Sequence, residues 1–412
     1  MQEIAKKINS IGGRLYLVGG AVRDEIMGRK LSDEDYCVVG ITQEEFQTLF
    51  PDAITRGKSF EVFDLYGREF AMARTETKVG KGHKEFEIQT SKQITIEEDL
   101  SRRDVTINSI AKDVLTGKII DPFNGREDIQ NKILRATTGK FKEDPLRVYR
   151  VARMAANFEF DVEEKTMELM KSLKNELNSL SPERVFVEFR KALCSNKPSI
   201  FFEVLRKTGL LEIHFKEISN LIGAEQPKKY HPEGDSYNHT MQALDKASLL
   251  TKDEKIKYAV LVHDLGKGLT PKEKYPHHYG HDKMGGPLVI DLSNRLKVPN
   301  SWKNAGKISA LEHMKAGIFN EMSYAKQVDL IEKLNKSELG LEGMQIVVIA
   351  DRWRYSKKPD GINFAQIGKR VLKEITGDSI IKKYKITDGI KIKEKLREER
   401  IKHLKDIENW NI

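Results

Sequence analysis

Asp33 and Asp35, in the stretch YLVGGAVRDEIMGRKLSDEDYCVVG (16–40), have the residue types and spacing of a metal site. Residues two apart on a β-strand project from the same face, so both carboxylates would point together while Glu34 points away. Two carboxylates that close repel each other unless a cation lies between them. Mg²⁺ prefers oxygen ligands and keeps positions open for substrate phosphates. The pair predicts metal-dependent phosphoryl or nucleotidyl transfer, although the spacing alone also suits a surface turn with incidental acids.

A glycine turn, Gly19-Gly20, lies between the preceding apolar run and this acidic pair. Glycine lets a backbone approach a triphosphate closely, because it carries no side chain and accepts positive φ. Arg23 follows at once, and its guanidinium can pair with phosphate oxygens. We therefore expect Gly20 and Arg23 to contact a nucleotide.

The elements that must position these groups change in character along the chain. Residues 14 to about 120 contain short β-like runs, with helical patterns such as TQEEFQTLF and TINSIAKDVL between them. From about Asp144 onward the patterns are nearly all helical. The strands that we expect are LYLVGG, DYCVVG, EVFDLYG, EFAMAR and EFEIQT.

Bulk properties narrow the class of protein. A chain of 412 residues suggests two to four domains. Its 71 Lys and Arg exceed its 62 Asp and Glu, a net charge of +9 that favours a polyanionic partner such as nucleic acid. Two cysteines, Cys37 and Cys194, exclude a disulfide framework. No apolar run is long enough to span a membrane, and no secretory signal is apparent, so we expect a cytoplasmic protein.

The stretch EDPLRVYRVAR contains a pair of residues that could read a base. Asp144, Arg147 and Arg150 lie three residues apart, and we expect them on one face of a helix with Pro145 in its first turn. An ionised Asp only accepts hydrogen bonds and Arg only donates them. Cytosine and adenine each show an amino donor beside a ring-nitrogen acceptor, whereas uracil and guanine show the reverse. Such a pair would accept CTP and ATP without a template, unless the helix is merely amphipathic with a capping acid and solvated arginines.

Four motifs in order resemble those of bacterial tRNA nucleotidyltransferases and poly(A) polymerases. The resemblance implies an α+β fold class: a small mixed α/β nucleotidyltransferase head with a mostly antiparallel sheet, followed by an all-helical neck and body. The motifs are LVGGAVRD…GRKLSDEDYCVVG, EEDLSRRDVTINSIAKD, IIDPFNGREDIQNKILR and FKEDPLRVYRVARMAANF.

The same resemblance implies roles for single residues. It assigns base reading to Asp144 and Arg147, and it places Arg103 and Arg150 against the nucleotide. By position in the family pattern, Glu69 in GREFAMART is our candidate for a third catalytic carboxylate beside Asp33 and Asp35. The alternative for Glu69 is an exposed glutamate at the start of a strand.

A second group of candidate residues extends from 228 to 351. The order His239, His263-Asp264, His281, Asp351 resembles the HD phosphohydrolase superfamily, whose imidazoles and carboxylates bind a divalent cation that activates water. The resemblance favours His281 over His277 and His278, and it implies a transition metal, with Ni²⁺ as one candidate. Lys267 could pair with phosphate. We expect His83, His214, His231, His313 and His403 to be ordinary core or surface residues.

The whole chain resembles the HD-containing tRNA nucleotidyltransferases, the multifunctional CCA-adding proteins of bacteria. The implied function is addition of C, C and A to tRNA from CTP and ATP with Mg²⁺, together with hydrolysis of 2′,3′-cyclic or terminal phosphates. The alternatives are a poly(A) polymerase, an A-only adding enzyme, and an RNA-binding protein with an inactive head; either a monomer or a homodimer is compatible. The expected domains are a head (1–140), a neck and body (141–225), an HD domain (226–355) and a basic helical tail (356–412).

Overall fold

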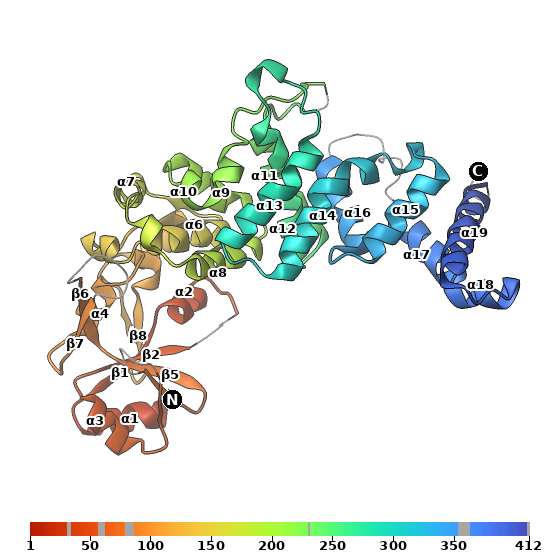
Figure 1. The fold of residues 1–412 in the computed structure, drawn as a ribbon. Coiled ribbons are helices and arrows are strands. Elements are labelled where there is room, and N and C mark those ends of the chain that lie inside the picture. The colour runs from red at the N-terminus through yellow and green to blue at the C-terminus, as the bar shows by residue number, and fades with distance from the viewer. Residues whose placement is uncertain (31–33, 57–61, 79–85, 230, 353–362, 410–412) are drawn as a thin grey trace. The chain divides into compact units, whose positions relative to one another are not determined.

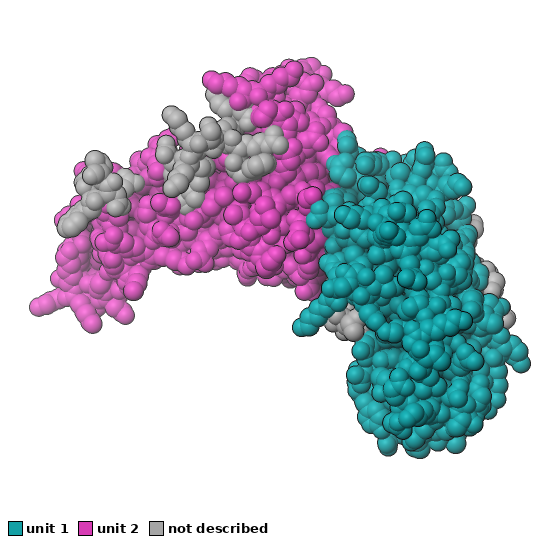
Figure 2. Space-filling model, turned by 180° about the vertical axis from the view of Figure 1, so that it is seen from behind, with its two compact units in different colours: residues 1–189, 200–210 teal, residues 190–199, 211–412 magenta. Residues whose placement is uncertain are grey.

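The structure is a computed structural model that describes residues 1–412 except for 31–33, 57–61, 79–85, 230, 353–362 and 410–412 (Figure 1). The chain forms two compact units (Figure 2). Unit 1 contains residues 1–189 and 200–210, and unit 2 contains residues 190–199 and 211–412. The four-domain division expected from the sequence stays a prediction.

Unit 1 is built on a seven-stranded sheet in which every neighbouring pair is antiparallel except β2 and β5. The mostly antiparallel head that the sequence led us to expect is thereby confirmed. This parallel pair matters for the site, because β2 and β5 then begin side by side at the same end of the sheet. In spatial order the strands are β3 (Ile54–Arg56), β4 (Val62–Leu65), β5 (Arg68–Met72), β2 (Asp35–Val39), β1 (Arg14–Val18), β8 (Ala111–Asp113) and β9 (Ile119–Ile120).

Strand β1 shows why both faces of this sheet are covered. Its side chains alternate between the faces, and all four residues from Leu15 to Val18 are buried. Leu15 and Leu17 pack with the first three helices, whereas Tyr16 and Val18 pack with the helix that follows Thr95. The helices are α1 (Gln2–Ser10), α2 (Gly20–Ile26) and α3 (Gln43–Leu49) on one face, and α4 (Ile96–Ser101) on the other.

The stretch TINSIAKDVL, which we expected to be helical, is a correction. Thr106–Asn108 form a single 3₁₀ turn, and Ala111–Asp113 form strand β8. The apolar spacing of this stretch suits either structure. Pairing with β1, in which Val18 lies opposite Ala111, decides for the strand.

The rest of unit 1 is mainly helical. Its helices bury an aromatic cluster in which Phe189 contacts Phe201 and Phe202. Two further strand pairs occur, and one of them adds a short strand to the stretch that we expected to be nearly all helical. The elements, of which α8 and α9 include residues that belong to unit 2, are β6 (Arg74–Lys78) with β7 (Phe86–Thr90), α5 (Gly125–Asn131), β10 (Ile133–Leu134) with β11 (Asp161–Val162), α6 (Arg147–Phe158), α7 (Glu164–Ser172), α8 (Pro182–Leu193) and α9 (Ser199–Lys207).

The regular elements of unit 2 are helices, apart from an isolated bridge between Glu225 and Asp235, in the part of the unit that the structure describes. Helices α11, α12, α13, α14 and α16 pack against one another. The C-terminal segment joins this unit rather than lying only on its surface, because Phe364, Val371, Leu404 and Ile407 enter the same core as α15 and α16. The helices are α10 (Leu211–Ser219), α11 (Ser236–Leu250), α12 (Glu254–Leu261), α13 (His281–Arg295), α14 (Asn300–Gly317), α15 (Tyr324–Asn335), α16 (Gly340–Arg352), α17 (Phe364–Glu374), α18 (Gly377–Tyr384) and α19 (Gly389–Asn409).

Within the part of the chain that the structure describes, no helix combines the length and the apolar character needed to cross a membrane.

Candidate active sites

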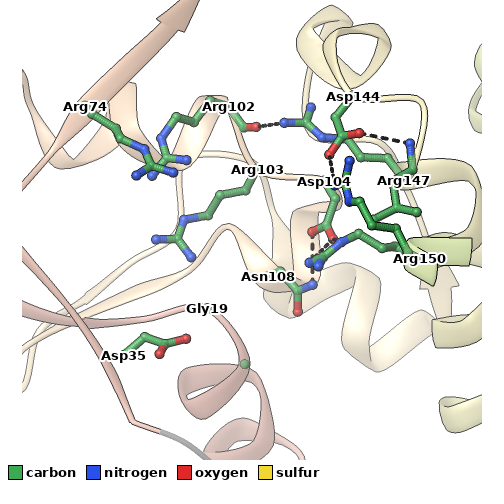
Figure 3. A pocket seen from close by; sticks show the side chains of 13 residues that line it. Gly19, Asp35, Arg74, Arg102, Arg103, Asp104, Asn108, Asp144, Arg147 and Arg150 are labelled. Carbon is green, nitrogen blue, oxygen red and sulfur yellow. Dashed lines mark hydrogen bonds and ion pairs between the residues drawn. The ribbon is translucent and has the colours of Figure 1, made fainter. Parts of the chain in front are cut away.

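A cavity of about 390 Å³ in unit 1 collects most of the predicted head residues (Figure 3). Six arginines and three aspartates line it, so it is strongly cationic and carries a few carboxylates. Phosphates are bound by such arginine clusters, since guanidinium groups offer several donors in a rigid plane. The lining residues are Gly19, Gly20, Asp35, Arg74, Arg102, Arg103, Asp104, Asn108, Asp144, Leu146, Arg147, Arg150 and Arg184.

Asp35 and Glu69 lie side by side on neighbouring strands of the sheet. Asp35 begins β2, Glu69 is the second residue of β5, and the two lie opposite each other in the parallel register. Both are exposed, and both line a second cavity of about 200 Å³ that shares Asp35 with the first. The structure thus brings Glu69 to Asp35, while Asp33 lies outside the described residues.

The turn before α2 requires glycine at its first position. Gly19 has φ of +70°, and a Cβ there would lie 2.8 Å from Nη1 of Arg103. Glycine therefore lets Arg103 lie directly over the turn, and Figure 3 shows its guanidinium extended toward Gly19 and Asp35. Arg23 faces inward instead: it donates to Asp24 at 2.8 and 2.9 Å and to the side-chain oxygen of Asn108 at 2.5 Å.

Two buried aspartates orient the arginines of the cavity. Asp104 accepts from Arg150 at 2.6 and 2.7 Å and from Asn108 at 3.0 Å. Burial would raise the pKa of Asp104, but the positive charge of Arg150 and these hydrogen bonds lower it well below its usual value. The attraction to Asp104 raises the pKa of Arg150 in turn, so the pair is held ionised.

Asp99 has the same effect on the next pair of arginines. It accepts from Arg102 at 2.7 Å and from Arg103 at 3.1 Å, and it is 1% exposed. Burial alone would raise the pKa of Asp99, yet the two guanidinium groups lower it. Because Asp99 anchors one side of each arginine, both are held beside the cavity.

Asp144 lies before the helix that we expected to contain it, which is a correction. Helix α6 begins at Arg147, and Asp144 is extended, with φ of −118° and ψ of 107°. Its Oδ1 accepts from the backbone N–H of Leu146 at 3.0 Å, and its Oδ2 accepts from Arg184 at 3.3 Å. The residue before a proline favours extended backbone, which explains why the helix starts after Pro145.

Arg147 is buried and its guanidinium plane is fixed by the backbone. It donates to the carbonyl oxygen of Lys140 at 2.7 Å and to that of Arg102 at 2.5 Å. Asp144 and Arg147 thus both line the cavity, each held by groups from other segments, as Figure 3 shows.

Several lining residues were not predicted from the sequence. Asp104 directly follows Arg103 in SRRDVTINS, and Asn108 lies four residues later. An acid and an amide this close to basic residues were a usable signal. The sequence offers no such signal for the arginines outside that motif, because basic residues are abundant in this chain. The unpredicted lining residues include Arg74, Arg102, Asp104, Asn108 and Arg184.

The predicted histidines and aspartates of unit 2 also come together. One group of possible ligands, whose donor atoms all lie within 4.8 Å of one another, contains His239, His263, Asp264 and Asp351. His239 Nε2 lies 2.8 Å from Asp351 Oδ1, and His263 Nε2 lies 3.2 Å from Asp264 Oδ2 and 3.6 Å from Asp351 Oδ1. Buried imidazoles and carboxylates in this arrangement suit a divalent transition metal.

The pair His263-Asp264 follows helix α12, which ends at Leu261, rather than lying inside it. Gly266 then allows α13 to approach, since a Cβ at Gly266 would lie 1.9 Å from the carbonyl oxygen of His281. This contact places His281, the first residue of α13, at Asp264: the distance from His281 Nε2 to Oδ1 is 3.3 Å.

The charges of this cluster are strongly coupled. Burial would lower the pKa of His263, but Asp264 and Asp351 raise it to about 10. Burial would raise the pKa of Asp264, yet His263 and Lys267 hold it well below its usual value. In the absence of an ion, the carboxylates therefore favour protons on the imidazoles. A divalent cation would supply the same compensating charge.

His313, which we expected to be an ordinary core histidine, lies beside the predicted ligands. It is 2% exposed, and its Nε2 lies 3.4 Å both from His281 Nε2 and from Asp264 Oδ1. Its position on α14, far along the chain from the other histidines, left no recognisable spacing. His278, by contrast, is engaged through both ring nitrogens, to Thr270 Oγ1 at 2.9 Å and to the Glu225 carbonyl at 2.8 Å.

Two protein-family models match the N-terminal half. One, described as "Poly A polymerase head domain", matches residues 15–135, and the other, described as "Probable RNA and SrmB- binding site of polymerase A", matches residues 159–222. The matched head range contains Gly20, Asp35, Glu69 and Arg103.

Two curated relatives resemble the chain over most of its length. The chain is 44% identical over 347 residues to the Multifunctional CCA protein of Shewanella denitrificans, covering 82% of this chain and 83% of that protein. It is 43% identical over 327 residues to the Multifunctional CCA protein of Shewanella frigidimarina, covering 78% of each.

Solved structures share the fold. A Thermotoga maritima CCA-adding enzyme complexed with tRNA_CCA superposes with a TM-score of 0.66 at 22% identity, covering 98% of this chain and 90% of that one. A CCA-adding enzyme in complex with ATP gives a TM-score of 0.67 at 21% identity, covering 98% and 88%. The fold is that of these enzymes, a mixed α/β nucleotidyltransferase head followed by a helical body. Given the relatives above, the chain belongs to the family of the multifunctional CCA proteins.

Proposed function

We propose that this protein adds C, C and A to the 3′ end of tRNA, using CTP and ATP. The observation that carries the proposal is one arginine-lined cavity that holds Asp35 together with Asp144 and Arg147. One part of that cavity has a carboxylate for catalysis, and another has a fixed acceptor and a fixed donor for a base. The names of the curated relatives support the same function.

In the head, Mg²⁺ would be held by Asp35 and Glu69, with Asp33 as the further ligand. The donor set fits the ion, because exposed carboxylates at the start of two neighbouring strands offer only oxygen. When bound, the ion neutralises charge that develops on the reacting phosphate. Arg102 and Arg103, anchored by Asp99, would bind the triphosphate oxygens over the Gly19-Gly20 turn.

Base selection rests on the fixed positions of Asp144 and Arg147. The carboxylate accepts the amino hydrogen of cytosine or adenine, and the guanidinium donates to the adjacent ring nitrogen. Uracil and guanine would face like groups at both positions, and a buried mismatch of that kind is strongly rejected. Arg150, held by Asp104, would contact the nucleotide from the next turn of α6.

Incubation of the purified protein with tRNA lacking its 3′ end, Mg²⁺ and each labelled nucleoside triphosphate tests this function. We expect addition that stops after C, C and A, with no use of UTP or GTP. Long adenosine tails would identify a poly(A) polymerase, and addition of A only to tRNA ending in CC would identify an A-adding enzyme. Binding of tRNA without any addition would indicate an inactive head.

We also propose that unit 2 carries a metal-dependent phosphohydrolase site. The observation that favours it is that His263 Nε2 and Asp264 Oδ1 are buried without hydrogen-bond partners among the described residues, whereas Asp264 Oδ2 is ion-paired with Lys267 Nζ at 2.6 Å. Such orphaned donor atoms fit a divalent transition metal such as Ni²⁺, held by His239, His263, Asp264 and Asp351.

When bound, that ion would activate water for attack on phosphorus. His239 is oriented for ligation, because its Nδ1 lies 2.7 Å from Glu233 Oε1 while Nε2 faces Asp351. The expected substrates are 2′,3′-cyclic and terminal phosphates, including damaged tRNA ends. Release of phosphate from nucleoside 2′-phosphates and opening of 2′,3′-cyclic AMP, each with added Ni²⁺ or after chelation, test the activity. No metal-stimulated turnover of either would contradict it.

A further inference from the structure

We propose that unit 2 has a binding surface for a nucleobase, formed by the ring of Tyr279 stacked on that of His277. The proposal deepens the phosphohydrolase function above and rests on it, because it names the group that would hold the base of the substrate. The ligand is the last nucleotide of an RNA strand that ends in a 2′-phosphate or a 2′,3′-cyclic phosphate.

The loop that carries this pair is fixed to the candidate phosphohydrolase site. Residues 271–280 form the loop, which lies in the chain between Asp264 and His281. Near its end, the carbonyl oxygen of His278 accepts a hydrogen bond from His281 Nδ1 at 2.8 Å. Tyr279 is two residues before His281, so their Cα atoms are at most about 7 Å apart. A base stacked on Tyr279 therefore lies close to the proposed metal ligands.

The two rings are held parallel, and Tyr279 remains open to solvent. Their centroids lie 5.6 Å apart and their planes differ by 18°. Tyr279 is 83% exposed, more than any other large apolar side chain among the residues that the structure describes. His277 covers one face of the tyrosine ring, so a ligand would stack on the other face. Proteins bind unpaired bases by stacking them on exposed aromatic rings of this kind.

A second loop, formed by the described residues of 225–235, brings basic side chains beside the aromatic pair. His278 Nε2 lies 2.8 Å from the carbonyl oxygen of Glu225. Lys267 donates to Gln226 Oε1 at 2.6 Å, so the two loops lie side by side at one end of α11 (Figure 1). Positive charge next to exposed aromatic rings is the pattern of surfaces that bind single-stranded nucleic acid. The exposed charged side chains of the two loops are Lys228, Lys229, Lys272, Lys274, Glu225 and Glu273.

Stacking implies a particular substrate preference. Every base has a π-face, so a stacking surface tolerates all four bases. Unit 2 should therefore accept guanine and uracil, which the base-reading pair of the head is proposed to reject. Phosphate esters that lack a base make no such contact and should bind more weakly. The substrate class that follows is an RNA end with a 2′-phosphate or a cyclic phosphate, whatever its last base.

Photocrosslinking to the full-length protein locates the base without requiring hydrolysis. The probe is 8-azidoguanosine 2′-phosphate, used with a chelator that prevents turnover. We expect it to label the tryptic peptide of residues 275–283, and an excess of RNA ending in a 2′,3′-cyclic phosphate should suppress the label whereas glycerol 2-phosphate should not. Labelling only of other peptides, no labelling, or a label that the RNA end does not suppress would overturn the proposal. The expected label in a protein without metal-stimulated hydrolysis would contradict the phosphohydrolase function alone.

Variants of Tyr279 separate stacking from a structural role. Tyr279→Ala should raise the KM for guanosine 2′,3′-cyclic phosphate by roughly tenfold and leave kcat unchanged. Hydrolysis of glycerol 1,2-cyclic phosphate, which has no base, should not change. Tyr279→Phe keeps the ring and should behave as wild type, as should Leu249→Ala, which removes an exposed apolar side chain elsewhere in unit 2. An unchanged KM for the guanosine ester in Tyr279→Ala, or an equal loss with the base-free ester, would overturn the proposal.

Discussion

Arg184, on helix α8, donates a hydrogen bond of 3.3 Å to the carboxylate of Asp144, forty residues earlier in the chain. The other oxygen of that carboxylate accepts from the Leu146 N–H, so both oxygens are held from different sides. The Asp144 carboxylate, which we propose reads the base, is thereby fixed in direction before any nucleotide binds. A fixed acceptor discriminates better than a mobile one, because it cannot turn to suit the wrong base.

Replacing Arg184 tests whether this pair matters for base selection. Arg184→Ala frees the carboxylate to rotate, and we expect the preference for CTP over UTP in kcat/KM to fall by roughly tenfold, about 1.4 kcal/mol. Single-nucleotide addition to truncated tRNA measures it. The control Arg190→Ala removes an exposed arginine of the same helix, which pairs with Glu254 instead. Equal losses for the two variants would exclude a specific role for Arg184.

Removing the carboxylate of Asp144 should have a larger effect on selectivity. Asp144→Ala eliminates the acceptor for the amino group, so UTP and GTP no longer meet an opposing carboxylate. We expect misincorporation to rise while correct addition falls. Competition between labelled CTP and UTP on one tRNA provides the measurement. Unchanged selectivity would show that the base is read by other groups.

Glu69 is the testable member of the proposed head metal site. Glu69→Gln keeps its size and removes its charge beside Asp35, so we expect nucleotide addition to fall by roughly a hundredfold or more, about 2.7 kcal/mol of barrier. Asp35→Ala should cost roughly a thousandfold or more. Raised Mg²⁺ should partly restore the Glu69→Gln variant, whereas Asp52→Asn, an exposed acid outside both cavities, should behave as wild type. Full activity of the Glu69→Gln variant would show that Glu69 does not bind the metal ion together with Asp35.

The two proposed activities should be separable. His263→Ala removes a ligand from unit 2 only, so we expect phosphate release to be lost and addition to truncated tRNA to survive. Both assays on one preparation measure this. Parallel loss of both activities in a folded variant would mean that the residues of unit 2 act in nucleotide addition.

His214 makes the stability of unit 2 depend on pH. Burial, with a smaller contribution from the positive charge of Arg295, lowers its pKa to about 4 from 6.5. Stability is therefore complete above pH 6.5, and it falls as the pH drops toward 4, because only the unfolded chain takes up the proton. At pH 5.5 the loss of unfolding free energy should be about 1 kcal/mol. Urea unfolding at pH 7.5 and 5.5 measures it, and His214→Gln should lose this difference while His277→Gln keeps it.

The sequence by itself predicted the residues of both candidate sites where they are close along the chain. The Gly19-Gly20 turn, Asp35, Asp144 with Arg147, and His263-Asp264 were recognisable because each motif combines residue types that a single element brings together. The family and the α+β class followed from the order of those motifs. Helix boundaries were less accurate: the sequence spacing placed Asp144 inside a helix, whereas Pro145 keeps it extended.

Only the tertiary structure decided which distant groups complete the sites. Asp35 meets Glu69 because β2 and β5 pair in parallel register. Arg184 reaches Asp144 from another helix, and His313 reaches His281 because α14 packs against α13. The last two contacts have no spacing that the sequence could reveal, and Glu69 was proposed only from its position in the family pattern. They arise from strand pairing and helix packing, which depend on burial of the whole apolar surface rather than on local preference.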